Sequence, residues 1–333
     1  MNNTTESMNK LRTVTCALAL LGSIMFFIVV GCRQHQSEPK EITIGTFSRA
    51  IDYAPYYVAR HFKWFEEQLQ ATSAGITISY REFGSFPEIA QGFQDNTLGA
   101  FFSAEAPATI LRAQPNDIRV VEVGCTLQQE VVVRRDLPVK SVADLRGRKI
   151  AVLKGTSSHY GLLNILKANG LKPEDVTIQD VPPPTAQAAF QSGDIDAWAV
   201  WPPFVEEQEV SGKGLVLKGG DAVIQSVMSE PQRLISTQRA VAQALVAAIQ
   251  RAKDWIQANP EEAVSIVSKE LKIDPGIVKL AWPKHNWAAT LSENVTVDIE
   301  AKAKFLSEQK DLVRNNQVVN VRTDLLDTSF VRK

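Results

Sequence analysis

Short runs of strand character alternate with longer helical patterns, and this alternation occurs twice along the chain. The first stretch begins with "EITIGTF" (Glu41–Phe47), where apolar residues recur at alternate positions, and continues with the helical spacing of "YAPYYVARHFKWFEEQL" (53–69). The second begins with "RKIAVL" (148–153) and continues with "HYGLLNILKANG" (159–170). Strands that alternate with helices favour parallel sheets in an α/β fold. The sequence therefore predicts two similar α/β lobes, each a mostly parallel sheet flanked by helices.

The order of these patterns divides the chain into parts that leave the first lobe and return to it. We expect residues 41–130 and 230–333 to form lobe I and residues 131–229 to form lobe II. Two crossing strands would join the lobes as a hinge. "EVVVRRD" (130–136) would leave lobe I, and "PQRLISTQRA" (231–240) would return to it. The mostly helical patterns that follow are expected to brace the lobes.

The first 31 residues differ in composition from the rest. Lys10 and Arg12 precede an apolar stretch from Val14 to Val30, and "VVGC" then ends at Cys32. A basic start, an apolar stretch and a small residue before a break are typical of a secretory signal. The alternative is a membrane anchor, but a stretch of about 17 residues lies at the lower limit for spanning a bilayer.

The "VVGC" motif resembles the lipobox of bacterial lipoproteins. That resemblance implies that residues 1–31 are a signal peptide, that Cys32 is lipidated after cleavage, and that residues 32–40 form a short tether. The mature protein would then lie outside the cytoplasm, in the periplasm or at the cell surface. Lipid on Cys32 would anchor it to a membrane.

Composition excludes several classes of protein. The chain has 333 residues and a formal net charge of −1, so its charge does not point to a nucleic-acid partner. Once Cys16 leaves with the signal and Cys32 is lipidated, Cys125 has no partner for a disulfide within the chain. We expect it to be a small buried residue. The sequence has no CxxC motif and no metal-spaced cluster of His and Cys, so we expect neither a metal nor a cofactor.

The predicted sheets indicate where a ligand would bind. In open α/β sheets, ligands bind beyond the carboxyl ends of the strands. Applied to both lobes, this rule selects six loops that would face a cleft between them. They are Thr46–Tyr53, Phe83–Phe86, Ser103–Pro107, Lys154–His159, Val181–Thr185 and Val200–Phe204.

Two blocks of sequence stand out, "VKSVADLRGRKIAVLKGTSSHYGLLNILKANGLKPEDV" (139–176) and "AAFQSGDIDAWAVWPPF" (188–204). In the order and spacing of their residues they resemble the solute-binding proteins of ABC importers for sulfonates and taurine. That group also serves nitrate, bicarbonate and pyrimidine thiamine precursors, and the resemblance covers nearly all of residues 41–330. It implies a two-lobed periplasmic-binding fold of the second type, without catalysis. Such a protein is a monomer that captures a small organic anion between its lobes and delivers it to an ABC permease and its ATPase.

Three segments depart from the pattern of that family, and all three fall in predicted cleft loops. "FFSAEAPA" carries Ser103 and Glu105 where the family often has "DxGxxxxP" or "GxGxxP". "WPPF" has Pro202 where the family often has "WDPY" or "WAPA", and the first loop, "SRAIDYAP", carries Arg49 and Asp52. These differences bear on the identity of the ligand rather than on the fold. They make Ser103, Glu105, Arg49 and Asp52 candidate ligand contacts.

Three hydroxyl residues, Thr156, Ser157 and Ser158, stand where a predicted strand gives way to a helix. A helix N-terminus has unpaired N–H groups and about half a positive charge, so this turn suits a sulfonate or a carboxylate. The alternative is ordinary N-capping, for which one such residue suffices. Lys154 would add charge to the site or lie in solvent. His159, in the first helical turn, would contact the ligand or have a structural role.

The remaining candidates bear on the charge and shape of the ligand. Glu105 and Asp52 would repel a simple anion but would suit a ligand that also carries an ammonium group, as taurine does. The alternative is that both are solvated loop carboxylates. Arg49 would bind the anion or pair with Asp52. Trp201 ends its strand and is expected to face the cleft, whereas Trp198, three positions earlier, points to the opposite face and into the core.

These observations favour one function over two others. The leading hypothesis is a lipid-anchored substrate-binding protein for an aliphatic sulfonate or a taurine-like amino sulfonate, with nitrate, bicarbonate or a pyrimidine thiamine precursor as alternative ligands. The second is a ligand-sensing module of the same fold. The third is an enzyme, but no nucleophile and base stand at a recognisable spacing. "KGTSSHYGLL" (154–163) also lacks the spacing of a Walker loop.

Overall fold

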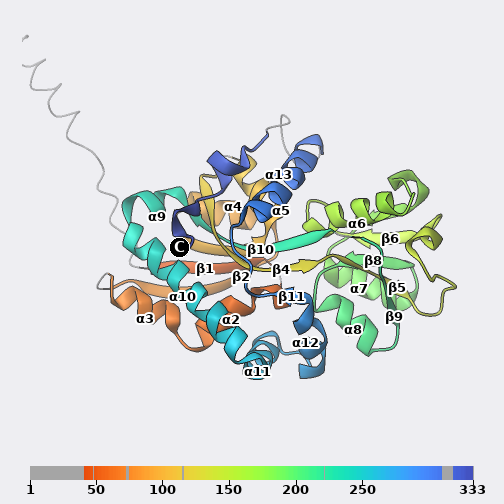
Figure 1. Ribbon diagram of the computed structural model, residues 1–333, viewed down its shortest axis with the longest axis horizontal. Helices are drawn as coiled ribbons and strands as arrows, with labels where there is room; N and C mark the ends of the chain where they lie inside the picture. Colours follow the sequence, from red (N-terminus) through yellow and green to blue (C-terminus); the bar gives the residue numbers. More distant parts are fainter. Residues whose placement is uncertain are drawn as a thin grey trace, which may run out of the picture. The chain divides into compact units, whose positions relative to one another are not determined.

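Two β-sheets form the framework of the described residues (Figure 1). One has six strands in the order β11-β4-β10-β3-β1-β2, and the other has five in the order β7-β6-β8-β5-β9. The first sheet contains β1 (Glu41–Phe47), β2 (Thr77–Phe83), β3 (Leu98–Ala104), β4 (Ile118–Gln128), β10 (Val223–Pro231) and β11 (His285–Asn286). The second contains β5 (Glu130–Arg134), β6 (Lys149–Val152), β7 (Thr177–Asp180), β8 (Ala197–Val200) and β9 (Gly214–Leu217).

The computed structural model describes residues 41–47, 49–72, 75–114, 116–220, 222–309 and 318–332. All of them belong to Lys40–Lys333, which forms one compact unit. The predicted signal peptide (1–31), the predicted lipidation site Cys32 and the predicted tether (32–40) lie outside the described residues. Within the described ranges, no helix combines the length and the apolar character needed to cross a membrane.

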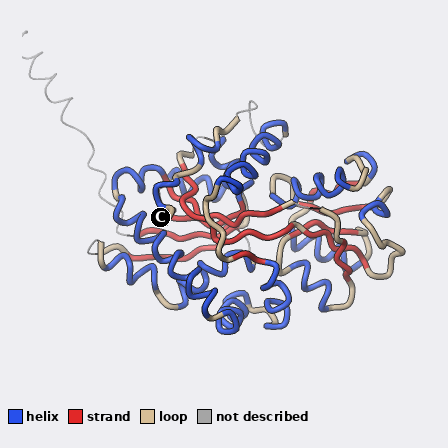
Figure 2. The backbone as a smooth tube through the Cα atoms, viewed as in Figure 1, coloured by secondary structure: helices blue, strands red, loops and turns tan. Residues whose placement is uncertain are grey.

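Helices cover both faces of the six-stranded sheet (Figure 2). Ile42 and Ile44 of β1 share a buried apolar cluster with side chains of α2, α3, α10, α11 and α12, and Phe101 of β3 lies in a cluster on the other face with α4. A further cluster joins α5 and α13 to β4. These helices are α2 (Ala54–His61), α3 (Trp64–Gln70), α4 (Phe86–Gln94), α5 (Glu105–Ala113), α10 (Arg239–Ala258), α11 (Pro260–Leu271), α12 (Pro275–Ala281) and α13 (Glu293–Glu308).

The five-stranded sheet is also covered on both faces. Helix α6 (Ser157–Ala168) packs on one face, and α7 (Pro183–Ser192) and α8 (Phe204–Val210) pack on the other. Strand β5 shows why. Val131 and Val133 join the apolar cluster that contains α6, whereas Val132 joins the one that contains α7 and α8. Alternate strand residues point to opposite faces, so an all-apolar strand needs cover on both. The predicted α/β architecture with two helix-flanked sheets is confirmed.

An antiparallel ribbon runs through both sheets and joins them. β4 pairs with β10 as far as Gln128 and Val223, and the N–H of Gln129 then donates to the carbonyl of Ala222 at 2.8 Å. Beyond this point β5 pairs antiparallel with β9. The ribbon strands also pair antiparallel with their other neighbours, β10 with β3 and β5 with β8. Each sheet is therefore mixed, and not mostly parallel as predicted. Its parallel pairs (β1–β2, β1–β3, β6–β7 and β6–β8) lie outside the ribbon.

The strand that returns to the six-stranded sheet is β10, so the prediction of a returning strand at 231–240 is wrong. Most of that segment is helical, beginning with α9 (Gln232–Thr237). β10 reads "VIQSVMSEP", in which Gln225, Ser226 and Ser229 are buried together with their apolar neighbours. A central strand with polar residues buried on both faces has no period-two pattern, which is why the sequence conceals it.

The division into lobes at 41–130 with 230–333, and 131–229, stays a prediction. The pairing of β10 favours a different second boundary, because residues 223–229 hydrogen-bond within the six-stranded sheet. We propose to place that boundary in the connection at 218–222.

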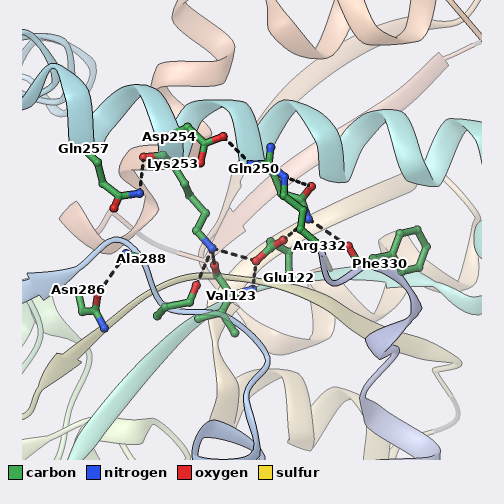
Figure 3. A network of polar contacts seen from close by, with 11 residues as sticks. Glu122, Val123, Gln250, Lys253, Asp254, Gln257, Asn286, Ala288, Phe330 and Arg332 are labelled. Atoms are coloured by element: carbon green, nitrogen blue, oxygen red, sulfur yellow. Dashed lines mark hydrogen bonds and ion pairs between the residues drawn. The ribbon is translucent and has the colours of Figure 1, made fainter.

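A buried ion pair fastens helix α10 to strand β4 (Figure 3). Lys253 Nζ lies 3.0 Å from Glu122 Oε1 and donates to the carbonyls of Val123 and Ala289, each at 2.6 Å. Gln250 Nε2 donates to the other Glu122 oxygen at 2.7 Å. Every donor of the ammonium thus has an acceptor, which a buried charge requires.

We expect Lys253→Met to destabilise the protein by about 3–5 kcal/mol, because it leaves the buried Glu122 carboxylate without its cation. Asp254→Asn is the matched control on the same helix, since the Asp254–Arg332 pair is exposed and is expected to contribute about 1 kcal/mol or less. Urea unfolding of both variants measures the difference. Equal losses would contradict this account of the buried pair.

Candidate functional site

A cavity lies where loops of the two sheets meet at the carboxyl ends of their strands. Its walls come from four of the six predicted loops and from β10. The lining residues are Phe47, Asp52, Tyr53, Ala104, Pro107, Thr156, Ser157, Ser158, Trp201 and Ile224. The predicted loops Phe83–Phe86 and Val181–Thr185 contribute no lining residue.

The cavity is narrow. Its volume is about 20 Å³. That is space for about one water molecule. A small organic ligand therefore requires the loops of the two sheets to move apart.

The N-terminus of α6 forms one wall, and Thr156 shapes it. Gly155 has a φ of +80°, a left-handed conformation that turns the chain after β6 at little cost for a glycine. Thr156 then acts as the N-cap, where its hydroxyl accepts from the N–H of His159 at 3.4 Å and donates to the carbonyl of Leu153 at 2.6 Å. The capping role that the sequence left open for this turn thus falls to Thr156.

Ser157 and Ser158 have no such structural role. Their side chains are buried, at 2% and 1% exposure, and neither hydroxyl has a hydrogen-bond partner among the described residues. A buried unpaired hydroxyl costs about 1–3 kcal/mol, so two at one position call for an explanation. Both line the cavity at the start of a 12-residue helix, whose N-terminus favours negative charge. This wall is suited to an anion.

Asp52 brings a carboxylate to the same cavity from the opposite sheet. It is 4% exposed, and its Oδ1 lies 3.2 Å from Nε2 of His285 on β11. The pattern around Asp52 in the sequence does not indicate this partner, because His285 lies 233 residues further along the chain.

The rest of the lining is mostly apolar and aromatic. Trp201 lies at the cavity as expected, and its indole N–H donates to the carbonyl of Arg49 at 3.2 Å. Trp198 is 1% exposed in the core. Tyr53, which the sequence analysis missed, donates to the carbonyl of Phe47 at 3.1 Å, and burial raises the pKa of its hydroxyl, so it stays neutral. These side chains offer apolar contact to the non-ionic part of a ligand.

Four of the nine predicted ligand contacts do not line the cavity, and three of them are Arg49, Ser103 and His159. The guanidinium of Arg49 pairs with Glu207 at 2.8 Å. The hydroxyl of Ser103 donates to the neighbouring carbonyl of Ala104 at 2.9 Å. His159 packs edge-on against the ring of Phe305, and burial lowers its pKa, which favours the structural role considered for it.

Glu105 is the fourth residue that the cavity excludes. Its side chain is fully buried, with Oε1 2.7 Å from Lys302 Nζ and Oε2 accepting from the N–H of Gln225 at 2.9 Å. Glu105 is therefore neither a solvated loop carboxylate nor free to bind a cationic group of a ligand. Its carboxylate is already paired with the ammonium group of Lys302 on α13. Lys302 is 197 positions away, and local sequence does not indicate it.

The structure thus brings together Asp52, Thr156, Ser157, Ser158 and Trp201 around one cavity. As ligand contacts they remain predictions. No group of three or more His, Cys, Asp or Glu side chains in the described ranges is placed to hold a metal ion.

A model of the NMT1-like family matches residues 35–269. An Escherichia coli (strain K12) protein, whose name marks it as a candidate aliphatic sulfonates-binding protein, is 26% identical over 317 residues, which cover 94% of each chain. The taurine-binding periplasmic protein of the same strain is 33% identical over 147 residues, or 44% of this chain and 45% of that protein.

A solved structure has the same fold. The alkanesulfonate-binding protein SsuA from Xanthomonas axonopodis pv. citri, bound to MOPS, aligns with a TM-score of 0.71 and 20% identity. The alignment covers 85% of this chain and 97% of that one. At this identity the likeness shows the two-sheet α/β fold.

The three hydroxyls are expected to differ in their effect on stability. Thr156→Ala should lower the free energy of unfolding by about 0.5–2 kcal/mol, because it removes the N-cap. Ser158→Ala should change it by less than about 0.5 kcal/mol, because the hydroxyl has no partner to lose. Urea unfolding without added ligand makes the comparison. A loss in Ser158→Ala as large as that in Thr156→Ala would mean that this hydroxyl has a structural partner.

Proposed function

The chain belongs to the NMT1-like family, and on that premise we propose that it is the substrate-binding protein of an ABC importer. It captures a small organic anion, an aliphatic sulfonate or a taurine-like amino sulfonate, and delivers it to the permease. Relatives named for binding aliphatic sulfonates and taurine support this proposal. So does the position of the cavity between the loops of two sheets.

One observation carries the choice of an anion. Ser157 and Ser158 place two buried hydroxyls without partners at the positive end of α6. A sulfonate has three oxygens that accept hydrogen bonds, so it can satisfy both hydroxyls and helix N–H groups together. Among the residues that the structure describes, no arginine or lysine lines this wall. Neutral donors in a narrow, mostly apolar cavity can therefore hold the charge.

Ligand capture by this protein works through closure. The anion contacts the wall from the second sheet, and its remainder contacts Phe47, Tyr53 and Pro107 from the first. Other contacts join the two sides of the cleft in the closed arrangement. Among them are the Arg49–Glu207 pair and the hydrogen bond from Ile51 N–H to the carbonyl of Pro202 at 3.3 Å. A ligand that binds both walls shifts the population toward the closed arrangement.

A binding role agrees better with Cys125 than an enzymatic role does. This thiol lies in β4 with no exposed surface, and burial raises its pKa well above its usual value. The thiolate is the nucleophilic form, so a thiol held neutral and out of contact with solvent is a poor nucleophile. It does not line the cavity.

The protein acts outside the cytoplasm. The name of its relative, the taurine-binding periplasmic protein, supports this location. We propose further that it is attached to a membrane through lipid on Cys32, with residues 32–40 as a tether. The "VVGC" motif after an apolar stretch supports this.

The proposed function predicts ligand-induced stabilisation. Ethanesulfonate or taurine at 100 times its dissociation constant should add about 2.7 kcal/mol to the free energy of unfolding. Thermal unfolding with a panel that also contains nitrate, bicarbonate and a hydroxymethylpyrimidine measures this. If only nitrate, bicarbonate or the pyrimidine stabilised the protein, that compound would be the ligand in place of a sulfonate. If no compound of the panel stabilised it, the proposal would be wrong.

Ser157→Ala in the same assay tests the wall itself. Loss of a hydrogen bond to a charged oxygen costs about 1.5–3 kcal/mol, so sulfonate affinity should fall roughly ten- to a hundredfold. Ser211→Ala is the control, because that hydroxyl donates to the carbonyl of Gln208 at the end of α8 and lies outside the cavity. Equal affinities of the two variants would contradict the role given to Ser157.

A further inference from the structure

His285 faces two groups that accept hydrogen bonds. Its side chain is fully buried, and its Nδ1 lies 2.9 Å from the carbonyl oxygen of Ala281 at the end of α12. Its Nε2 lies 3.2 Å from Oδ1 of Asp52, which lines the cavity. The ring stacks on Trp287, with centroids 4.7 Å apart and planes 2° apart. The imidazole is therefore held in one orientation behind the wall that Asp52 forms.

These contacts determine how many protons the pair holds. A backbone carbonyl only accepts, so Nδ1 must carry a proton to bond Ala281. A second proton must lie between Nε2 and Oδ1, because a bare ring nitrogen facing an ionised carboxylate would be repelled by it. Whichever of the two atoms holds that proton, the sum of the charges on His285 and Asp52 is zero.

The other titratable groups beside the pair do not change this sum. Tyr53 and Cys125 both lie against Asp52, and burial raises the pKa of each, so both stay neutral. Lys284, the residue before His285, is engaged by the carboxylates of Glu130 at 2.6 Å and Glu206 at 2.8 Å. The charge of Asp52 is therefore balanced by His285.

We propose that His285 is a specificity-determining residue, which neutralises Asp52 so that the cavity accepts a plain alkanesulfonate. This inference rests on the proposed function and narrows its ligand. An uncompensated Asp52 would repel a sulfonate and would require an ammonium group on the ligand. With His285 behind it, the wall is polar but carries no net charge. Affinity for the ligand then needs no cationic group.

Ethanesulfonate and taurine form the matched pair that tests this, because they differ by one ammonium group. In the full-length chain, His285→Gln keeps a hydrogen-bond donor for Asp52 but supplies no charge. We expect its affinity for ethanesulfonate to fall by about tenfold or more relative to its affinity for taurine. Isothermal titration calorimetry with both ligands gives the ratio. If the role of His285 were purely structural, the substitution would lower the affinities for both ligands equally.

A rescue variant separates charge from shape. In Asp52→Asn/His285→Gln neither residue is charged, so affinity for ethanesulfonate should recover from its value in His285→Gln by about tenfold. Failure to recover, or an unchanged ligand ratio in the single variant, overturns the inference while leaving the proposed function intact. Absence of binding of either ligand to the unaltered chain contradicts the proposed function instead.

A measurement on the unaltered chain decides the matter even if His285→Gln does not fold. Nitrogen-15 spectra of the histidine rings near neutral pH should show a proton on Nδ1 of His285 and a second proton shared between Nε2 and Asp52. A bare Nε2 beside an ionised Asp52 would give the pair a negative charge and overturn the inference.

Discussion

One buried ammonium group, that of Lys302, holds together the elements that meet beneath the cavity. It lies 2.7 Å from Glu105 at the start of α5 and 2.7 Å from Asp298 on its own helix. It also donates to the carbonyl of Val223 and, at 2.6 Å, to the side chain of Gln225, both on β10. Removing a partner from a fully buried cation costs several kcal/mol of folding free energy. The first turn of α5, with the cavity residue Pro107, is thereby fixed relative to the strand that re-enters the sheet.

Much of the fold could be predicted because local patterns of apolar residues indicate its strands and helices. The strand "RKIAVL" and the helix after it are recognisable from apolar spacing alone, and the valines of β5 divide between two faces by the same rule. Trp198 lies in the core and Trp201 lines the cavity, as expected, although both rings pack against Phe204. β10 escapes that reasoning, because Gln225, Ser226 and Ser229 are buried in it. Tertiary partners, including Lys302, satisfy such polar groups, and a strand pattern carries no information about them.

The same limit divides the candidate site. Hydroxyls at a helix start are a local feature, so Thr156, Ser157 and Ser158 could be found from the sequence. The charged candidates could not be assigned, because the environment of a charge depends on groups far along the chain. Arg49 and Glu105 are engaged by Glu207 and Lys302, and Asp52 is matched by His285. Residue types alone show that charges are present, but only the fold shows which of them are already compensated.

The ribbon that joins the sheets has a mechanical consequence. Its two strands, β4–β5 and β9–β10, are bonded side by side where the chain crosses from one sheet to the other. Bending within the plane of such a ribbon stretches one backbone and compresses the other, whereas bending out of the plane leaves the bonds between the strands nearly unchanged. The joint is therefore stiff in one direction and compliant in the other. Closure of the proposed binding site by bending at this joint would therefore move the two walls along an arc, and it would return the serines and Asp52 to the same alignment.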